Sequence, residues 1–256
     1  MRILGIDLGS RAVKLAVFDG NEFVIGKVFD TASFYRDYCE NRNQKIGINL
    51  EKLDIGEIHK IISTGYGRNN VNVSDAEVIT ELKAHTYGAV WQTGLKNFTL
   101  LDIGGQDSKV ISVRNGRMAD MVLNDKCAAS CGRYLENMAT IIGISIDEMK
   151  KYYNEPVELS STCAVFGESE LIGRISEGYT ADKLASGVNY SLYKRIKPMI
   201  ARFPADYLVL SGGVANNEAL IHFIKQDLGW GEIVVPGKPQ LNGSIGCCAY
   251  YFDKMN

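Results

Sequence analysis

The feature that most constrains the fold of this chain is a short motif that occurs twice. The first copy reads Asp-Leu-Gly-Ser-Arg-Ala-Val-Lys over residues 7–14, and the second reads Asp-Ile-Gly-Gly-Gln-Asp-Ser-Lys over residues 102–109. The aspartate, the apolar residue, the glycine, the small residue and the lysine fall in register without a gap, 95 positions apart. An internal duplication on this scale predicts two similar lobes.

Each copy lies within a predicted meander of three β-strands. An apolar run precedes the motif, and a run that alternates between apolar and polar residues follows it, as is typical of strands. Both second strands end at a dipeptide that favours a two-residue hairpin, Asp19-Gly20 and Asn115-Gly116. A third strand is expected at 23–29 and at 118–123. This order argues against a Rossmann fold, in which the glycine-rich turn leads into a helix, and the chain has no P-loop motif.

The remaining segments predict α/β lobes. Ser74 and Glu77 form a capping box that predicts a helix through about residue 90. Further strands are expected at 59–63, 207–210 and 232–235, and further helices at 133–142, 164–178, 218–227 and 244–252. We expect one lobe over residues 1–95 and a second over residues 96–256, with the C-terminal helix a candidate to pack back on the first lobe.

Composition limits the partners that the chain is expected to have. Its 256 residues carry a net charge of -2, so no basic surplus points to nucleic acid. No apolar run approaches the roughly 20 residues that cross a bilayer, and no signal peptide precedes the first strand. We therefore expect a cytoplasmic protein that binds neither nucleic acid nor membrane. Its six cysteines are then expected to be free thiols rather than structural disulfides.

The two hairpins carry residues that suit a nucleotide. Glycine lets backbone N–H groups approach phosphate oxygens, so two facing hairpins can grip a polyphosphate. Asp7 and Asp102 lie at the ends of their strands, where they can hold Mg²⁺ through waters. Gln106 or Asp107 can position the attacking water. A third strand ends at Gly212-Gly213, a turn that suits the close approach of adenosine.

Two cysteines share one setting. Cys127 and Cys163 each come just before a predicted helix, where the orphan N–H groups and the helix dipole stabilise a thiolate or an anionic cluster. Iron–sulfur clusters usually need four thiolates, so two ligands per chain are half a site that a two-fold dimer would complete. Buried and inert thiols remain the alternative for each cysteine.

The twin hairpins and the Gly-Gly turn resemble the superfamily of actin, heat-shock chaperones and sugar kinases. The resemblance implies an α/β, duplicated ribonuclease-H-like (actin-like ATPase) fold with two lobes and ATP or ADP with Mg²⁺ in a cleft between them. The nucleotide-binding candidates are the hairpin residues, the turn residues and one residue near the C-terminus: Gly9, Ser10, Arg11, Lys14, Gly104, Gly105, Gln106, Gly212, Gly213, Val214, Ala215, Asn217 and Gln240.

Four motifs in order resemble the activators of 2-hydroxyacyl-CoA dehydratases, also called the BadF/BadG/BcrA/BcrD ATPases. They are the second hairpin, the segments 124–136 and 161–170, and Ser-Gly-Gly-Val-Ala at 211–215. The resemblance implies a homodimer that shares one [4Fe-4S] cluster, held by Cys127 and Cys163 of each subunit. It also implies a ferredoxin or flavodoxin as electron donor, and a client iron–sulfur dehydratase that receives the electron when ATP is hydrolysed.

Other interpretations remain open. The family usually has Gly-Thr where this chain has Ser130-Cys131, so Cys131 is a further candidate to assist or replace a cluster ligand. The client is alternatively a benzoyl-CoA reductase or a double-cubane cluster protein. An alternative from another functional class is a small-molecule kinase of the N-acetylhexosamine type. Such a kinase would need an aspartate as the general base for its sugar and would need no iron.

Overall fold

The computed structural model describes residues 1–42, 45–66, 76–124, 130–160, 163–229 and 231–255. Its chain divides into two compact units. Unit 1 comprises Met1–Lys96, Val113–Met118 and Pro236–Asn256, and unit 2 comprises Asn97–Ser112 and Ala119–Val235. Within the described segments, no helix is long and apolar enough to cross a membrane.

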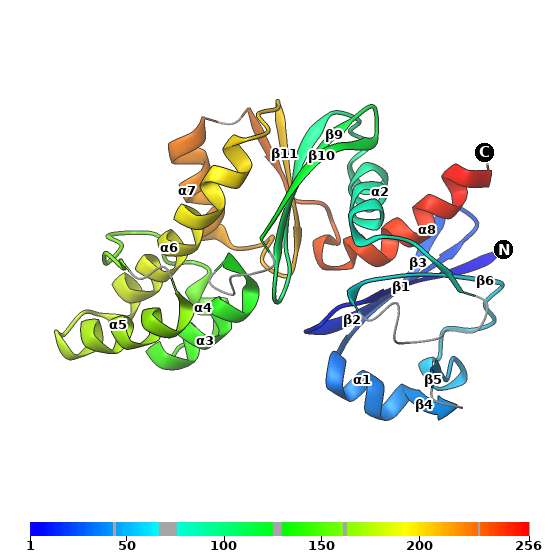
Figure 1. Cartoon of the computed structure of the whole chain (residues 1–256), viewed down its shortest axis with the longest axis horizontal. Coiled ribbons are helices and arrows are strands. Elements are labelled where there is room, and N and C mark those ends of the chain that lie inside the picture. The colour runs from blue at the N-terminus through cyan, green and yellow to red at the C-terminus, as the bar shows by residue number, and fades with distance from the viewer. Residues whose placement is uncertain (43–44, 67–75, 125–129, 161–162, 230, 256) are drawn as a thin grey trace. The chain divides into compact units, whose positions relative to one another are not determined.

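Unit 1 is built on a five-stranded sheet with the order β3-β2-β1-β6-β7; β1, β2, β3 and β6 are labelled in Figure 1. The three strands of the meander pair antiparallel, and β6 and β7 add parallel strands beside β1. The strands are β1 (Arg2–Leu8), β2 (Ala12–Asp19), β3 (Glu22–Asp30), β6 (Lys60–Thr64) and β7 (Ala76–Val78).

Three helices and a small hairpin complete unit 1. The helices are α1 (Thr31–Tyr38), α2 (Glu81–Thr93) and α8 (Asn242–Met255), with 3-10 turns η1 (Glu51–Leu53) and η4 (Pro239–Leu241) and a two-stranded sheet of β4 (Cys39–Arg42) and β5 (Lys45–Ile48). Side chains alternate between the two faces of a strand. Leu4, Ile6 and Leu8 therefore pack into one core, whereas Ile3 joins a second core with residues of α8. Asp7 shares the strand face of Ile3.

The helices α2 and α8 lie side by side and approach each other unusually closely (Figure 1). A Cβ atom on Gly88 would collide with the carbonyl oxygen of Asn242, and one on Gly246 with that of Ala84. Gly5 of β1 likewise has no room for a side chain beneath Ser244. The small residues at the start of α8 thus bring the helix backbone down onto β1 and α2, next to the end of β1 that carries Asp7.

The prediction of a helix from Ser74 is wrong in its start. Residues 76–78 form β7, which pairs in parallel with β6, and Ser74 lies outside the described residues. The helix begins at Glu81 instead, with the Thr80 hydroxyl accepting from the Lys83 N–H. A capping pattern depends only on local hydrogen bonds, whereas this segment pairs with β6, a strand that is distant from any capping contact.

Unit 2 repeats the sheet of unit 1. Its order is β10-β9-β8-β11-β12, with β11 parallel to both β8 and β12. The strands are β8 (Phe98–Ile103), β9 (Ser108–Arg114), β10 (Arg117–Asn124), β11 (Tyr207–Gly212) and β12 (Glu232–Val234). A meander followed by parallel strands, with the same order in both units, confirms the predicted duplicated ribonuclease-H-like fold.

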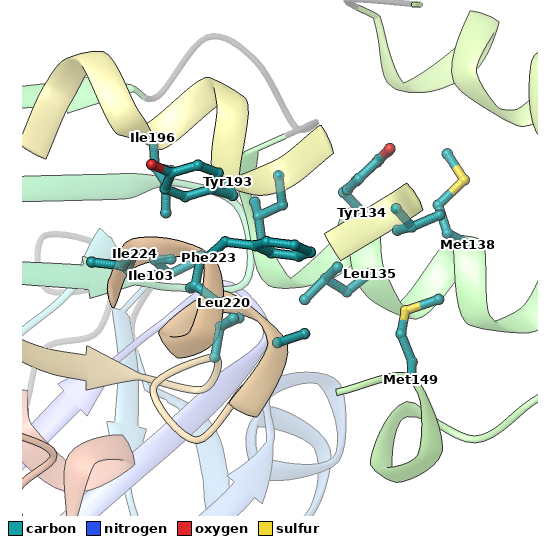
Figure 2. Packing of buried hydrophobic residues seen from close by; sticks show 14 of the residues in the cluster. Ile103, Tyr134, Leu135, Met138, Met149, Tyr193, Ile196, Leu220, Phe223 and Ile224 are labelled. Carbon is teal, nitrogen blue, oxygen red and sulfur yellow. The ribbon is translucent and has the colours of Figure 1, made fainter. Parts of the chain in front are cut away.

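The helices of unit 2 share one large apolar core with its sheet (Figure 2). They are α3 (Gly132–Ile142), α4 (Ile146–Met149), α5 (Ala164–Ser176), α6 (Ala181–Ala201) and α7 (Glu218–Leu228). Tyr193 of α6 packs on Phe223 of α7, and Leu135 of α3 lies in the same core. The sequence patterns did not predict α6, which runs for 21 residues with Pro198 inside it.

Candidate functional site

The first hairpin turn, residues 7–14, presents a buried carboxylate. Asp7 is 2% exposed and lies opposite Lys14 across the strand pair. The Lys14 ammonium donates to Asp7 Oδ2 at 3.2 Å. Asp7 Oδ1 is buried and has no hydrogen-bond partner within the part of the chain that the structure describes. A buried acceptor without a partner costs about 1–3 kcal/mol, and a magnesium-bound water would satisfy it.

The turn itself accepts only glycine at its centre. A Cβ atom on Gly9 would lie 2.7 Å from the Ala12 carbonyl oxygen and 2.8 Å from Lys14 Nζ. The Thr31 hydroxyl donates to the Gly9 carbonyl at 2.8 Å. The Arg11 guanidinium donates to Asp30 at 2.8 Å. The Ser33 N–H lowers the pKa of Asp30, and Arg11 lowers it further, so the exposed Asp30 carboxylate stays ionised beside the turn.

The second hairpin turn, residues 102–109, provides partners for both carboxylate oxygens of its aspartate. Asp102 is 2% exposed, and its Oδ1 accepts from the Ser211 hydroxyl at 2.7 Å. Lys109 is 4% exposed, and its Nζ lies 3.7 Å from Asp102 Oδ2 and 2.7 Å from Asp107 Oδ2. One buried cation therefore serves two carboxylates, and Asp107 is the more exposed of the two.

Gly104 and Gly105 form the tip of the second hairpin. The Gly104 N–H donates to the Asp107 carbonyl at 3.0 Å, and a Cβ atom on Gly104 would lie 2.8 Å from Asp107 Oδ1. Gln106 is exposed. The turn thus leaves backbone and the Gln106 side chain accessible while the charged side chains are held behind it.

The Gly-Gly turn begins where β11 ends. Gly212 has φ +86, and a Cβ atom there would collide with the backbone of Ile103, whereas no described atom lies within 4 Å of a Cβ on Gly213. Val214 and Ala215 are buried. Asn217 caps α7: its Oδ1 accepts from the Leu220 N–H, and its amide donates to Asn189. Gln240 is exposed in η4 of unit 1.

The candidate cluster cysteines differ in exposure. Cys163 is exposed at the N-terminus of α5, whereas Cys131 is fully buried at the N-terminus of α3. Cys127 lies outside the described residues. Among the residues that are described, no group of three or more histidine, cysteine or acidic side chains could hold a metal ion. Cys247 and Cys248 are buried beneath β1, and burial raises the pKa of both thiols.

A model of the BadF/BadG/BcrA/BcrD ATPase family matches residues 4–250. The chain belongs to this family. The 2-hydroxyisocaproyl-CoA dehydratase activator of Clostridioides difficile is 34% identical over 99% of this chain and 96% of its own length. The (R)-2-hydroxyglutaryl-CoA dehydratase activating ATPase of Acidaminococcus fermentans is 33% identical over 98% of this chain and 97% of its own length.

A solved structure extends the likeness from sequence to fold. It is the activator of the 2-hydroxyisocaproyl-CoA dehydratase from Clostridium difficile with bound ADPNP. The two structures superpose with a TM-score of 0.86 at 34% identity, over 99% of this chain and 95% of the other. The resemblance to the BadF/BadG/BcrA/BcrD ATPases that the four motifs indicated is thus confirmed.

Sequence reasoning missed three polar residues around the hairpins of this ATPase. Ser211 bonds Asp102 because both lie on one face of neighbouring parallel strands. Ser108 donates to the Ser130 carbonyl. A Cβ atom on Gly243 would lie 2.9 Å from Asp7 Oδ2 and 3.2 Å from His85 Nε2, so the buried His85 ring lies beside the first aspartate. These contacts join segments that are distant in the sequence, so the spacing of neighbouring residues does not predict them.

Proposed function

We propose that this ATPase uses ATP hydrolysis to drive electron transfer from a [4Fe-4S] cluster to a partner iron–sulfur enzyme of the 2-hydroxyacyl-CoA dehydratase type. The observation that carries the proposal is the exposed Cys163 thiol at the N-terminus of α5, in the same unit as a phosphate-type hairpin. A helix N-terminus stabilises a thiolate and, by the same dipole, an anionic cluster.

The residues of both hairpins fit a magnesium nucleotide. Unit 1 offers the unpartnered Asp7 oxygen, the Gly9 turn and the exposed Gln240. Unit 2 offers Asp102 and the backbone of the Gly104 turn, and Gly212, Gly213, Val214 and Ala215 form the candidate adenosine turn. Asn217 would support this turn as the cap of α7 rather than by direct contact, because both ends of its amide are bonded within unit 2.

Hydrolysis is then expected to rest on positioning and electrostatics. Mg²⁺ supplies charge neutralisation for the phosphoryl group when it is bound, and Asp7 and Asp102 would hold it through waters. Asp107 and Gln106 lie at the exposed edge of the second hairpin, where either can orient a water. The Lys109 ammonium lies 2.7 Å from Asp107 Oδ2 and holds that carboxylate in place. Ser10, Arg11 and Lys14 complete the first hairpin.

The surface of α5 supports the shared cluster and the homodimer. Val165, Phe166 and Ile172 are 67%, 70% and 58% exposed, although the same helix buries Leu171 on its other side. Exposed apolar side chains that cluster in this way mark protein–protein contacts. A second copy that covers them would bring its own Cys163 and Cys127 to the same site. Cys131 is the weaker ligand candidate because it is buried.

The wider setting is proposed from the family. The electron donor would be a ferredoxin or flavodoxin, and the client a 2-hydroxyacyl-CoA dehydratase or, alternatively, a benzoyl-CoA reductase or double-cubane protein. Cys39, Cys163, Cys247 and Cys248 are free thiols, which fits a reducing cytoplasm.

Iron and sulfide analysis of protein purified without oxygen tests the proposal. We expect about four irons per dimer in the wild type and in Cys39→Ser, a control thiol in unit 1. Cys127→Ser and Cys163→Ser should each lose the iron, whereas Cys131→Ser should keep it. A colourless wild type that converts ATP to ADP only by transferring the phosphoryl group to an N-acetylhexosamine would point to the kinase instead. Loss of iron in Cys131→Ser alone would overturn the ligand assignment.

A further inference from the structure

We propose that Ser108, Gly132 and Gly167 are positioning residues that connect the second hairpin to Cys163 through helix α3. All of the contacts that carry this inference lie within unit 2 and within described residues. The inference rests on the proposed function in one respect, because it assumes that the second hairpin responds to the nucleotide.

The first step joins the second hairpin to the start of α3. The Gly132 N–H donates to the Gly104 carbonyl at 2.9 Å, and the Arg133 N–H donates to the Gly105 carbonyl at 3.0 Å. The Ser108 hydroxyl donates to the Ser130 carbonyl. The first N–H groups of a helix have no partner inside the helix. Here the hairpin supplies those partners, so α3 begins directly on the tip of the hairpin.

This junction is dry and tightly packed. Ser108, Ser130 and Cys131 are all fully buried. A Cβ atom on Gly132 would lie 3.2 Å from the Gly104 carbonyl oxygen and 3.4 Å from Val214 Cγ2. Buried hydrogen bonds are costly to leave unmade, so a shift of the hairpin backbone must either carry α3 with it or break them. The burial of Cys131 is explained by this junction.

The second step joins α3 to α5. Tyr134 and Met138 lie one turn apart on the same face of α3, are both nearly fully buried, and are labelled together in Figure 2. A Cβ atom on Gly167 of α5 would lie 3.5 Å from Met138 Cε and 4.0 Å from the Tyr134 ring. The Gly167 N–H donates to the carbonyl of Cys163 at 2.9 Å. Gly167 thus lies within van der Waals range of the buried face of α3, in the helical turn that follows Cys163, although a Cβ atom would also fit there.

This series of contacts from the second hairpin through α3 to Cys163, called the relay below, couples its two ends reciprocally and has one link that can be removed selectively. A helix transmits displacement along its length because its backbone bonds are internal, and packed cores shift as units rather than deform continuously. The residues that matter are those at the two junctions, not those along α3. The N–H of Gly132 is the link that one substitution can remove without breaking the helix.

Proline at position 132 removes that donor and keeps the helix. Residue 132 is the first residue of α3, the position at which proline is favoured, and Cys131 already has the extended backbone, φ -135 and ψ 174, that precedes proline. Gly132→Ala is the matched control. It adds the same Cβ atom and retains the N–H, so the difference between the two variants isolates the hydrogen bond to Gly104.

Amide hydrogen exchange of the full chain, with Mg²⁺ and either ADP or the imido analogue of ATP, tests the relay. In the wild type and in Gly132→Ala, the peptide that spans 163–171 should exchange about 5- to 150-fold differently with the two nucleotides, the usual range of coupling between sites. Gly132→Pro should remove most of this difference while the hairpin itself still responds. The proposal would be overturned if the exchange of peptide 163–171 in Gly132→Pro still differed between the two nucleotides as much as in the wild type. It would also be overturned if wild-type protein with bound nucleotide showed no such difference.

A second pair of variants covers the case in which proline prevents folding. Ser108→Ala deletes the hydroxyl that reaches Ser130, and Ser112→Ala, at a buried serine on the same strand, is its control. Only the first should reduce the nucleotide response at 163–171, and equal responses in the two would contradict the proposal. Amide exchange does not require iron, so a protein without a cluster would refute the proposed redox function and leave this test valid.

Discussion

Each hairpin is tied to the next helix along the chain, but by different means. In unit 1, the Thr31 hydroxyl at the start of α1 donates to the Gly9 carbonyl, and its N–H donates to the Arg11 carbonyl at 3.4 Å. In unit 2, two backbone N–H groups of α3 donate to Gly104 and Gly105. The helix α1 is short and fully buries only Phe34, whereas α3 is longer and leads through the core to α5. The helix α3 therefore gives the second hairpin a buried route to the exposed Cys163, whereas α1 ends at Cys39, which is only partly buried.

The two aspartates differ in the same sense. Asp7 keeps one buried oxygen without a partner among the described residues, and its lysine is partly exposed. Asp102 has Ser211 on one oxygen and the buried Lys109 beside the other. The Asp7 carboxylate thus retains an oxygen that can accept a hydrogen bond from a ligand. The Asp102 carboxylate is held on both oxygens by side chains of the protein. The predictions below probe this difference.

The largest expected effect is on stability, from Lys109→Met. The substitution leaves Asp102 buried and Asp107 unpaired, and breaking a buried ion pair from one side costs about 3–5 kcal/mol. Lys14→Met should cost less, about 1.5–3 kcal/mol, because water can reach the partly exposed Lys14 site and replace the cation. Urea unfolding of both variants measures the two costs, and equal costs would contradict the difference between the hairpins.

The second prediction separates activity from stability. Asp7→Asn and Asp102→Asn should each lower ATP hydrolysis by about 100-fold or more, because each removes charge that would organise Mg²⁺. Their free energies of unfolding should diverge. Asp7→Asn should be nearly neutral, since one carboxylate oxygen already has no partner among the described residues, whereas Asp102→Asn removes one of the two negative charges beside the buried Lys109 cation. A steady-state ATPase assay and urea unfolding, run on the same preparations, check both parts.

The third prediction concerns alkaline pH and unit 1. Burial raises the pKa of Cys39 to about 11 and raises those of Cys247 and Cys248 still further, from an ordinary value of 9.0. Above pH 9 the unfolded chain loses thiol protons that the folded chain retains, so stability falls as pH rises and is fully present below pH 9. The loss is about 1 kcal/mol per thiol between pH 9 and 10, because half of the unfolded thiol is already ionised at pH 9. Cys247→Ala should reduce the difference in unfolding free energy between pH 8 and pH 10 by the contribution of one thiol.

Local periodicity predicted the repeated part of the molecule and not the contacts that specialise it. The two motifs, both meanders and helix α3 up to Gly143 follow from strand alternation and helix capping, which are properties of neighbouring residues. The start of α2 and the whole of α6 did not, because pairing with β6 and burial in a shared core decided them. The bond from Ser108 to Ser130 and the exposure of α5 arise only after folding brings distant segments together.

The smallest expected effect compares the tips of the two meanders. The sequence predicts turns at Asp19-Gly20 and Asn115-Gly116, and the second is confirmed, but Asp19 pairs with Glu22, so the first turn is Gly20-Asn21. Asn115 has φ 51, whereas Asn21 is not among the described non-glycine residues with positive φ. Asn115→Ala should therefore cost about 0.5–1 kcal/mol, since alanine lacks asparagine's tolerance of the left-handed region. Asn21→Ala should cost almost nothing. Thermal unfolding of the two variants measures both losses of stability. A loss in Asn21→Ala as large as that in Asn115→Ala would mean that the two tips use the same kind of turn.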